Sequence, residues 1–393
     1  MAIKILWQVF IGLILAALSL SPVQSLFFNT GRWLYILIFA MSSCYFLIPF
    51  CRIAAIRLKI VDNPNWRKVH TKATPLLGGL AVYLAFILSL LFNNIFLPGM
   101  ALILVGGSLI FLMGLADDIR PLPASLKLTF QILFALIVIV PGNIQLTYFY
   151  HESWAHLINI PLTVLWIVGL TNAMNFFDGL DGLAAAISII IAVFLGIISF
   201  KTYQPALGWI SIAMAGSCIG FMPYNFRFGQ SARIFLGDAG STFIGFTLAC
   251  LAVLGNWSAT SNLVSLTAPI LIFGILIFDM TYVNLSRIKN RLAANFLELL
   301  KCANKDHLHH RLLMMGFTAK ETVFIISIMS ACLGVSALII MKQNITEALL
   351  GLGQAVMILG LIVILMRKGR EKSSKEGEKG QPMRRRGDHI RLD

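Results

Sequence analysis

Residues 183–200 read LAAAISIIIAVFLGIISF, an apolar stretch without a single charged side chain. A helix rises about 1.5 Å per residue, so a stretch of this length spans most of the roughly 30 Å hydrocarbon core of a bilayer. Its flanks are polar, with Asp181 before it and Lys201 at its end. The stretch therefore predicts a helix that crosses a membrane.

Eleven further apolar runs lie on both sides of this one. The chain has 393 residues, 58% hydrophobic and 12% charged, whereas soluble domains carry about 25% charged residues. This composition excludes a cytosolic enzyme, a disordered protein and a secreted disulfide scaffold. It predicts an all-α polytopic integral membrane protein with about 11–12 transmembrane helices, at residues 5–21, 33–56, 76–97, 100–116, 125–141, 157–174, 183–200, 206–223, 239–254, 266–284, 321–341 and 348–366. The first run can also be interpreted as a signal peptide, but no clear small-x-small cleavage site follows it.

The net charge of +14 comes from residues that set the orientation of the chain. With the N-terminus inside and strict alternation, only Arg32, Lys201 and Lys342 lie outside, and the other 28 of the 31 Lys and Arg lie inside. This is the positive-inside pattern of a membrane protein rather than the charge of a nucleic-acid binder. We expect residues 1–366 to form one membrane domain and residues 367–393 a basic, disordered cytoplasmic tail. The six Cys show no CxxC pair and indicate neither a metal site nor a disulfide framework.

The predicted inner connections contain most of the unusual polar sequence. Asp117 and Asp118 are adjacent at the inner end of a span, with Lys127 nearby. Neighbouring carboxylates repel each other unless a cation or basic groups neutralise them. A solvated helix end is the alternative, but five polar segments on one face favour one cytoplasmic site.

A second segment, TNAMNFFDGLDG, places Asn172, Asn175, Asp178 and Asp181 at a spacing of three. This spacing puts neighbouring members on one side of a helix. Oxygen ligands of this kind suit Mg²⁺ or Mn²⁺. In FLGDAGS, Asp238 stands where a helix begins, and the glycines would let backbone amides face an anion. An N-cap aspartate is the alternative there.

The loop at 285–320 contains three His within four residues, His307, His309 and His310, followed by Arg311. It lacks the matching Cys or His pair of a zinc site, and a cationic clamp for phosphate oxygens fits better. A further basic rim contains Asp62, Arg67, Lys68, His70 and Lys72. Asp279, inside a predicted span, has no assigned role. Carboxylates, a divalent cation and a cationic loop at one membrane face favour phosphoryl transfer to or from a lipid phosphate.

Five motifs in this order carry a resemblance to a known family: DNPNWRKVHTKATPLLGGL, GLADDIRPLPASLK, TNAMNFFDGLDGLAA, RIFLGDAGS and DHLHHRLLMMGF. The chain resembles the polyprenyl-phosphate N-acetylhexosamine-1-phosphate transferases (glycosyltransferase family 4) from about residue 45 to 330. Its HLHHRL form is similar to the bacterial undecaprenyl-phosphate GlcNAc-1-phosphate transferases. In phospho-MurNAc-pentapeptide translocases the His run is usually uninterrupted, whereas here Leu308 interrupts it.

The resemblance implies a role for each matching residue. Asp117 and Asp118 match the paired aspartates, the first of which orients or deprotonates the lipid phosphate. Asn175 and Asp238 match metal positions, with Asp178 and Asp181 close to the pyrophosphate. The remaining matches are substrate-binding positions: Asn225 and Phe235 near uracil and ribose, Lys127 after the aspartate pair, and His307, His309, His310 and Arg311 on phosphates or sugar.

The implied reaction transfers GlcNAc-1-phosphate from UDP-GlcNAc to undecaprenyl phosphate and releases UMP, with Mg²⁺ or Mn²⁺ as cofactor. The implied location is the bacterial inner membrane, at the first membrane step of a cell-envelope polysaccharide. The alternatives left open are another UDP-N-acetylhexosamine, the phospho-MurNAc-pentapeptide donor, a CDP-alcohol phosphotransferase, and a lipid-linked sugar carrier. The oligomeric state also stays open, with a homodimer among the options.

Overall fold

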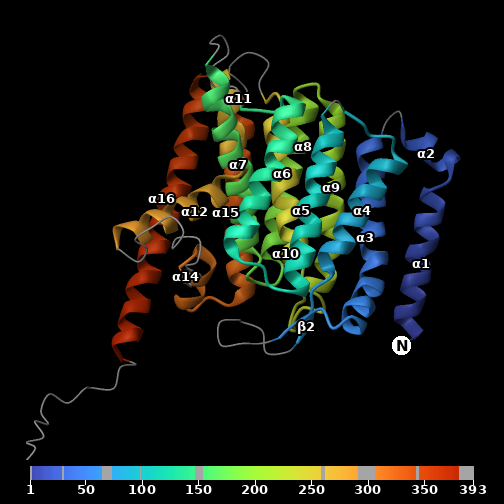
Figure 1. Ribbon diagram of the computed structural model, residues 1–393, viewed down its shortest axis with the longest axis horizontal. Coiled ribbons are helices and arrows are strands. Elements are labelled where there is room, and N and C mark those ends of the chain that lie inside the picture. Colours follow the sequence, from blue (N-terminus) through green and yellow to red (C-terminus); the bar gives the residue numbers. More distant parts are fainter. Residues whose placement is uncertain are drawn as a thin grey trace, which may run out of the picture.

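The computed structural model describes residues 2–28, 31–63, 73–97, 99–146, 154–257, 262–290, 306–341 and 345–379. Within these ranges the chain is almost entirely helical, and most helices stand side by side in one bundle (Figure 1). The strands described there are β1 (Val61–Asp62) and β2 (Thr74–Pro75), which pair antiparallel with Val61 opposite Pro75. The all-α prediction is confirmed.

The helices follow the apolar runs closely. They are α1 (Ala2–Leu18), α2 (Ser21–Phe28), α3 (Arg32–Arg57), α4 (Gly78–Phe92), α5 (Met100–Ile119), α6 (Ala124–Gly142), α7 (Ala155–Phe177), α8 (Leu183–Lys201), α9 (Pro205–Asn225), α10 (Gly237–Leu254), α11 (Asn262–Ile272), α12 (Gly274–Lys289), α14 (Leu308–Met314), α15 (Ala319–Ile340) and α16 (Ile345–Lys379). Among the described residues, nine of these helices are long and apolar enough to cross a membrane. The protein is therefore a multi-pass membrane protein.

Three of the twelve predicted spans differ from the structure. The run at 5–21 forms α1, and the chain then bends by 70° into α2. The run at 76–97 contains only the short helix α4, because Asn93 bonds back to Ser89 O and Asn94 takes a left-handed conformation with φ 50°. The run at 266–284 is broken at Phe273 into α11 and α12.

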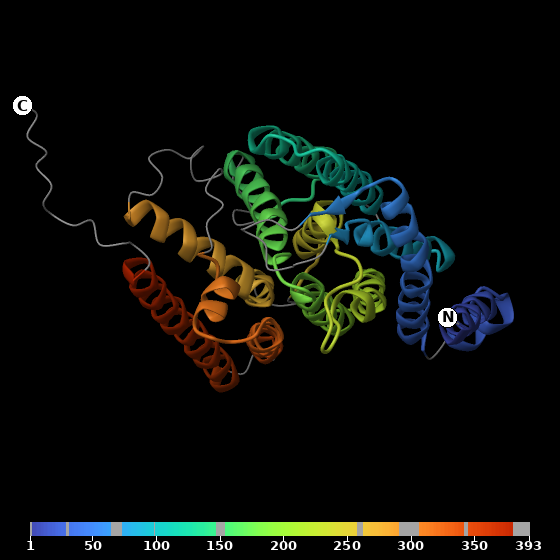
Figure 2. The same cartoon turned by 90° about the horizontal axis from the view of Figure 1, so that it is seen from below.

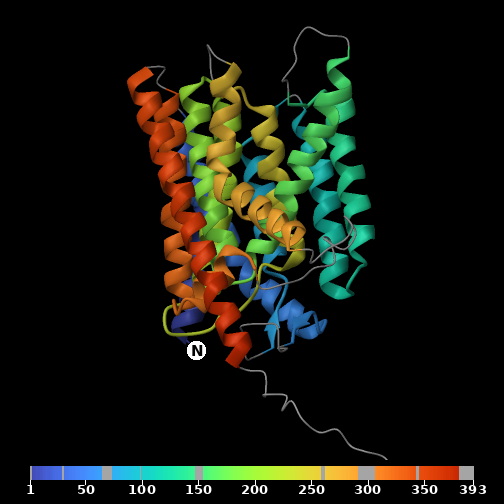
Figure 3. The same ribbon diagram turned by 90° about the vertical axis from the view of Figure 1, so that its left-hand side faces the viewer.

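The break after α11 has a consequence for the buried charge at Asp279. Figure 3 shows α12 lying obliquely across the bundle instead of along it. This direction brings Asp279 to the start of α14, where its carboxylate has two partners. A carboxylate left alone inside an upright span would carry a large desolvation cost.

The centre of the bundle is α10, where 83% of an apolar 18-residue stretch is buried inside the protein (Figure 2). The helix α4 packs directly against α10, and the two backbones touch. A Cβ on Gly79 would lie 2.4 Å from Gly240 Cα, so glycine is required there. The first amides of α4 donate to the chain before α10, Gly78 N to Phe235 O at 2.9 Å and Gly79 N to Leu236 O at 2.8 Å.

The start of α1, the strand β2 and the helix α14 lie at the same end of the bundle, which we call the site end (Figure 1). There α16 continues beyond the predicted end of its span at Met366, and stays helical to Lys379. The domain division at residue 366 stays a prediction. Four members of the predicted basic rim, Arg67, Lys68, His70 and Lys72, lie outside the described residues.

Candidate active site at one end of the bundle

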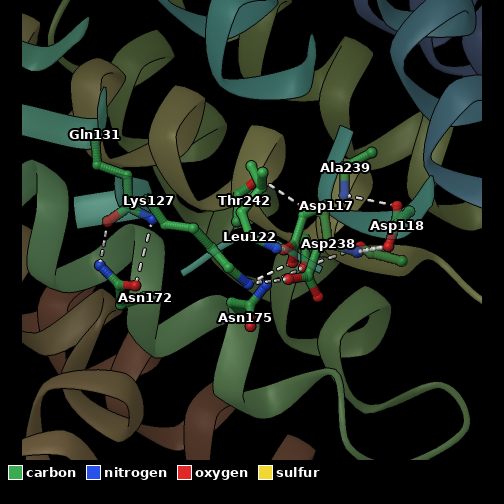
Figure 4. A network of polar contacts seen from close by, with 12 residues as sticks. Asp117, Asp118, Leu122, Lys127, Gln131, Asn172, Asn175, Asp238, Ala239 and Thr242 are labelled. Carbon is green, nitrogen blue, oxygen red and sulfur yellow. Dashed lines mark hydrogen bonds and ion pairs between the residues drawn. The ribbon is translucent and has the colours of Figure 1, made fainter. Parts of the chain in front are cut away.

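The centre of the site is an ammonium group shared by two carboxylates. Lys127, in the first turn of α6, contacts Asp117 Oδ2 at the end of α5 and Asp238 Oδ2 at the start of α10, the latter at 3.1 Å. Asp117 Oδ1 also accepts a hydrogen bond from Leu122 N at 2.7 Å. Three helices thus converge on one cation (Figure 4). The sequence analysis predicted that these residues lie in one site, because it placed them at the inner ends of predicted transmembrane helices.

The second aspartate of the pair has a different environment. Asp118 accepts from the backbone of α10, from Asp238 N at 2.8 Å on Oδ1 and from Ala239 N at 3.1 Å on Oδ2. Its carboxylate therefore caps the N-terminus of α10 from a neighbouring helix. The sequence predicted that these amides face an anion, and in the structure they face Asp118. Gly237 makes this approach possible, because it has φ +77° and a Cβ there would lie 2.6 Å from Asp118 Oδ2.

Asn175 lies beside Asp238 in the last turns of α7 (Figure 4). Its Nδ2 donates to Ser241 Oγ at 3.2 Å, so the amide oxygen is the atom that could coordinate a cation. The side chain of Asp238 is 34% exposed and that of Asp117 is 8% exposed. Oxygens from an amide and a carboxylate therefore line an accessible position at the end of the bundle.

The amide one turn earlier, Asn172, forms a clamp with Gln131 on α6. Asn172 Nδ2 donates to Gln131 Oε1 at 2.6 Å, and Gln131 Nε2 donates to Asn172 Oδ1 at 3.3 Å. Most of α6 lies on the outside of the bundle, since only 22% of its apolar 18-residue stretch is buried. Gln131 is nevertheless buried. Because Gln131 follows Lys127 by one helical turn, the clamp fixes the face of α6 that carries Lys127. The sequence analysis missed Gln131, although a polar residue one turn from Lys127 in an apolar run was a usable signal.

The loop after α7 contains the next two carboxylates. Asp178 caps the end of α7, and burial together with the nearby charges of Asp238 and Asp118 raises the pKa of its carboxyl well above the ordinary value. Asp181 accepts from Ala232 N at 3.0 Å. Gly182 has φ +85°, and a Cβ there would lie 2.5 Å from the Phe226 ring. The glycine thus serves the packing of the loop, in addition to any approach by a ligand.

Asn225 and Phe235, the two residues predicted near a nucleoside, are held by this loop and by the β1–β2 pair. Asn225 is buried, and its amide joins two segments, accepting from Gly182 N at 2.6 Å and donating to Ile234 O at 3.0 Å. The Phe235 backbone joins β2, because its amide donates to Pro75 O at 2.8 Å. Asn225 therefore lies beside the Asp181 loop, and Phe235 lies between β2 and the start of α4. The contact of either residue with a nucleoside stays a prediction.

The predicted cationic loop forms α14 at the same end of the bundle. His307 and Leu308 N contact Asp279, and Arg287 holds Asp306 with two hydrogen bonds of 2.8 and 2.7 Å. Arg311 donates to Asp306 O at 2.7 Å and to Met366 O at 3.1 Å. Arg311 thus links α14 to α16. Its predicted contact with a phosphate or sugar stays a prediction.

His309 lies deepest in this group. It is 1% exposed, and neither ring nitrogen has a hydrogen-bond partner in the described structure. Burial, and then the neighbouring His310 and His307, lower the pKa of His309 well below the ordinary value. A Cβ on Gly179 would lie 2.9 Å from His309 Nε2, so α14 touches the loop of Asp178. The histidines and the carboxylates therefore border one site.

Comparison with known proteins identifies the group to which this site belongs. The family model of glycosyl transferase family 4 matches residues 100–256. A probable undecaprenyl-phosphate N-acetylglucosaminyl 1-phosphate transferase of Bacillus subtilis (strain 168) is 31% identical over 354 residues, which cover 88% of this chain and 93% of the relative. This chain belongs to glycosyl transferase family 4.

Two further relatives of this family 4 protein extend the comparison. A decaprenyl-phosphate N-acetylglucosaminephosphotransferase of Mycolicibacterium smegmatis is 30% identical, over 83% of this chain and 86% of the relative. An undecaprenyl-phosphate alpha-N-acetylglucosaminyl 1-phosphate transferase of Escherichia coli (strain K12) is 26% identical, over 72% and 77%. Membership of family 4 confirms the resemblance inferred from the motifs and the prediction of a membrane transferase.

Proposed function

We propose that this family 4 protein transfers GlcNAc-1-phosphate from UDP-GlcNAc to undecaprenyl phosphate. The products are UMP and undecaprenyl-diphospho-GlcNAc. The names of the Bacillus subtilis and Escherichia coli relatives support this reaction. The structural observation that supports it most is the Lys127 ammonium between Asp117 and Asp238. A cation and carboxylates at one end of the bundle suit the binding of a phosphorylated substrate together with a metal ion.

In the proposed reaction an oxygen of the lipid phosphate attacks the β-phosphorus of the nucleotide sugar. The bond from that phosphorus to the bridging oxygen breaks, and UMP leaves with the electron pair. A phosphate monoester has a second pKa of about 6, so the nucleophile is already largely ionised at neutral pH. Asp117 therefore orients the nucleophile more than it removes a proton, and Lys127 offsets negative charge.

A divalent cation, Mg²⁺ or Mn²⁺, belongs to this proposal. No group of three or more His, Cys, Asp or Glu side chains within the described ranges is arranged to hold a metal by itself. Mg²⁺ usually binds one or two carboxylates together with water and substrate phosphates, so the Asp238 carboxylate and the Asn175 amide oxygen fit this chemistry. A bound cation would neutralise pyrophosphate charge at this position.

Release of UMP from labelled UDP-GlcNAc by the purified protein tests the reaction. We expect product only with undecaprenyl phosphate present and only with a divalent cation. Asp238→Asn should lower turnover by orders of magnitude in folded protein, whereas Glu347→Gln, the same kind of change at the start of α16, should leave it unchanged. Full turnover in excess chelator would exclude the metal, and a sugar lipid that crosses the bilayer without UMP release would indicate a carrier.

The sugar is tested with a panel of donors in the same assay. We expect UDP-GlcNAc to give the highest kcat/KM among UDP-GlcNAc, UDP-GalNAc, UDP-QuiNAc and UDP-MurNAc-pentapeptide. A higher value for another donor would keep the reaction class and replace the sugar.

We place the site on the cytoplasmic side of the bacterial inner membrane. The Lys and Arg distribution supports this, and nucleotide sugars are cytoplasmic metabolites. In a Cys-free background, Ser125→Cys and Ser231→Cys should react with an impermeant maleimide only after the inner face is opened. Lys201→Cys, at the other end of α8, should react from outside. Labelling of Ser231→Cys and Lys201→Cys from the same side would refute the placement.

A further inference from the structure

The contact between α12 and the start of α14 contains a carboxylate that the reaction described above does not use. Asp279 is 1% exposed, and both of its oxygens are occupied. Oδ1 accepts from Leu308 N at 2.8 Å, and Oδ2 lies 2.7 Å from His307 Nδ1. The same helix also holds residue 306 through Arg287. The first residues of α14 are thus held at two points by α12.

The imidazole of His307 is fixed in orientation as well as in place. Its ring stacks on Phe176, with centroids 4.9 Å apart and planes inclined by 23°. His309 lies on a nearly parallel plane, at 6.1 Å and 9°. The His307 carbonyl accepts from Arg311 N at 3.1 Å in the first turn of α14. Rotation of the ring would break the contact with Asp279, so Nε2 is the ring nitrogen that remains for a substrate.

Asp279 also determines what this nitrogen can do. A carboxylate only accepts hydrogen bonds, and a neutral imidazole carries one proton on one of its two nitrogens. In the neutral ring, the short contact with Asp279 therefore keeps this proton on Nδ1 and leaves Nε2 as an acceptor. An acceptor recognises a hydroxyl or an amide N–H. An N-acetylhexosamine offers both kinds of donor.

We propose that Asp279 is a positioning residue that holds His307 as the Nδ1–H tautomer, so that Nε2 accepts a hydrogen bond from a hydroxyl or acetamido N–H of the donor sugar. This inference rests on the proposed function. It assigns the buried carboxylate of α12 to sugar recognition through His307, in the way that residues behind a ligand orient it.

Two nearly isosteric variants separate this role from simple support of α14. In Asp279→Asn the amide oxygen still accepts from Leu308 N, but the amide NH₂ faces His307 Nδ1 and moves the ring proton to Nε2. In His307→Asn the side-chain NH₂ still reaches Asp279 and asparagine remains a good N-cap, but the atom at Nε2 is gone. Each variant should lower kcat/KM for UDP-GlcNAc about 10- to 100-fold. The loss should be mainly in KM.

The double variant provides the decisive comparison. If Asp279 acts through His307 Nε2, adding Asp279→Asn to His307→Asn should lower kcat/KM by less than about twofold. Losses that multiply in the double variant would show that Asp279 supports α14 independently of His307, and would overturn the proposal. Full activity of Asp279→Asn would overturn it too.

A spectroscopic measurement keeps the inference testable apart from the enzymatic activity. In protein labelled with ¹⁵N-histidine, the His307 signals are those lost in His307→Asn. We expect a protonated Nδ1 and an unprotonated Nε2 in the unchanged protein, and the reverse in Asp279→Asn. A protonated Nε2 in the unchanged protein near pH 7, with or without a proton on Nδ1, would refute the proposal. If the tautomer is as expected but no donor yields UMP, the proposed function fails and the positioning of His307 stands.

Discussion

Asp118 provides the sharpest test of how the site is held together, since its contacts differ from those of its neighbour Asp117. Its carboxylate accepts from the amides of Asp238 and Ala239 at the start of α10, at 2.8 and 3.1 Å. Asp118→Asn keeps the shape of the side chain, but one oxygen becomes an NH₂ group. That group then faces a backbone N–H, so one of the two hydrogen bonds is lost and an amide is left without a partner.

The expected cost follows from the two hydrogen bonds. A buried amide left without a hydrogen-bond partner costs about 1–3 kcal/mol, and loss of an N-cap costs about 0.5–2 kcal/mol. We therefore expect Asp118→Asn to reduce the free energy of unfolding by about 2 kcal/mol. At about 2–4 °C per kcal/mol in a large domain, the unfolding temperature should fall by about 4–8 °C. Turnover should fall too, since Asp238 lies in the turn that is released.

The assay is thermal unfolding of the purified protein in detergent, without metal or substrate. Asp238→Asn is the matched control, because it removes a carboxylate from the same cluster but leaves the first amides of α10 bonded to Asp118. We expect the control to lose activity with a fall of less than about 1 kcal/mol in the free energy of unfolding, because it loses only the partly exposed contact with Lys127. An Asp118→Asn protein that is inactive but as heat-stable as the unchanged protein would refute capping and favour a direct role in the chemistry.

Three other perturbations test further parts of the site. Gln131→Leu should lower kcat/KM about tenfold by releasing the α6 face that carries Lys127, while Thr129→Val on the exposed side of α6 should have no effect; equal activity of both variants would exclude the clamp. The raised pKa of Asp178 means that its ionised form is destabilising in the folded protein. Its contribution to the free energy of unfolding is therefore fully present below the ordinary carboxyl pKa of about 4, and is lost as pH rises through the folded-state pKa. Asp178→Asn should therefore raise the unfolding temperature of metal-free protein at pH 7, and this gain should vanish near pH 3; a gain that is the same at both pH values would contradict the titration. Ending the chain after Arg370 should preserve transferase activity, but ending it before Met366 should reduce it, because Arg311 donates to Met366 O; loss of activity in both shortened proteins, when correctly inserted, would assign a function to the tail.

Much of the architecture could be predicted because transmembrane helices are determined locally. An apolar run of sufficient length forms a helix in lipid regardless of its neighbours, since each backbone group must find its partner within the segment. The runs at 183–200 and 206–223 match α8 and α9 to within about two residues at each end. The exceptions depended on contacts between helices. The break at Phe273 brings Asp279 to α14, and hydropathy does not contain that information.

The candidate site shows the same division. Acidic residues and amides beside a bilayer indicate a site from composition and spacing, because such groups are costly there. Pairwise contacts do not follow from spacing. Asp117 and Asp118 are adjacent in the chain, yet one contacts Lys127 and the other caps α10. A rotation of about 100° per residue along α5 sends them to different neighbours.

Chain composition and motif order alone establish a polytopic helical membrane protein, the end of the bundle that holds the polar residues, and the family. They suffice because burial in lipid and the residue types of a phosphate site are properties of short segments. The fold alone decides which polar groups serve chemistry and which serve support. Gln131, Asp279 and Asn225 lie far along the chain from the groups they hold, Asn172, His307 and Gly182. Such pairs form only when helices pack, because a hydrogen bond needs two atoms within about 3 Å of each other and no local pattern specifies that distance.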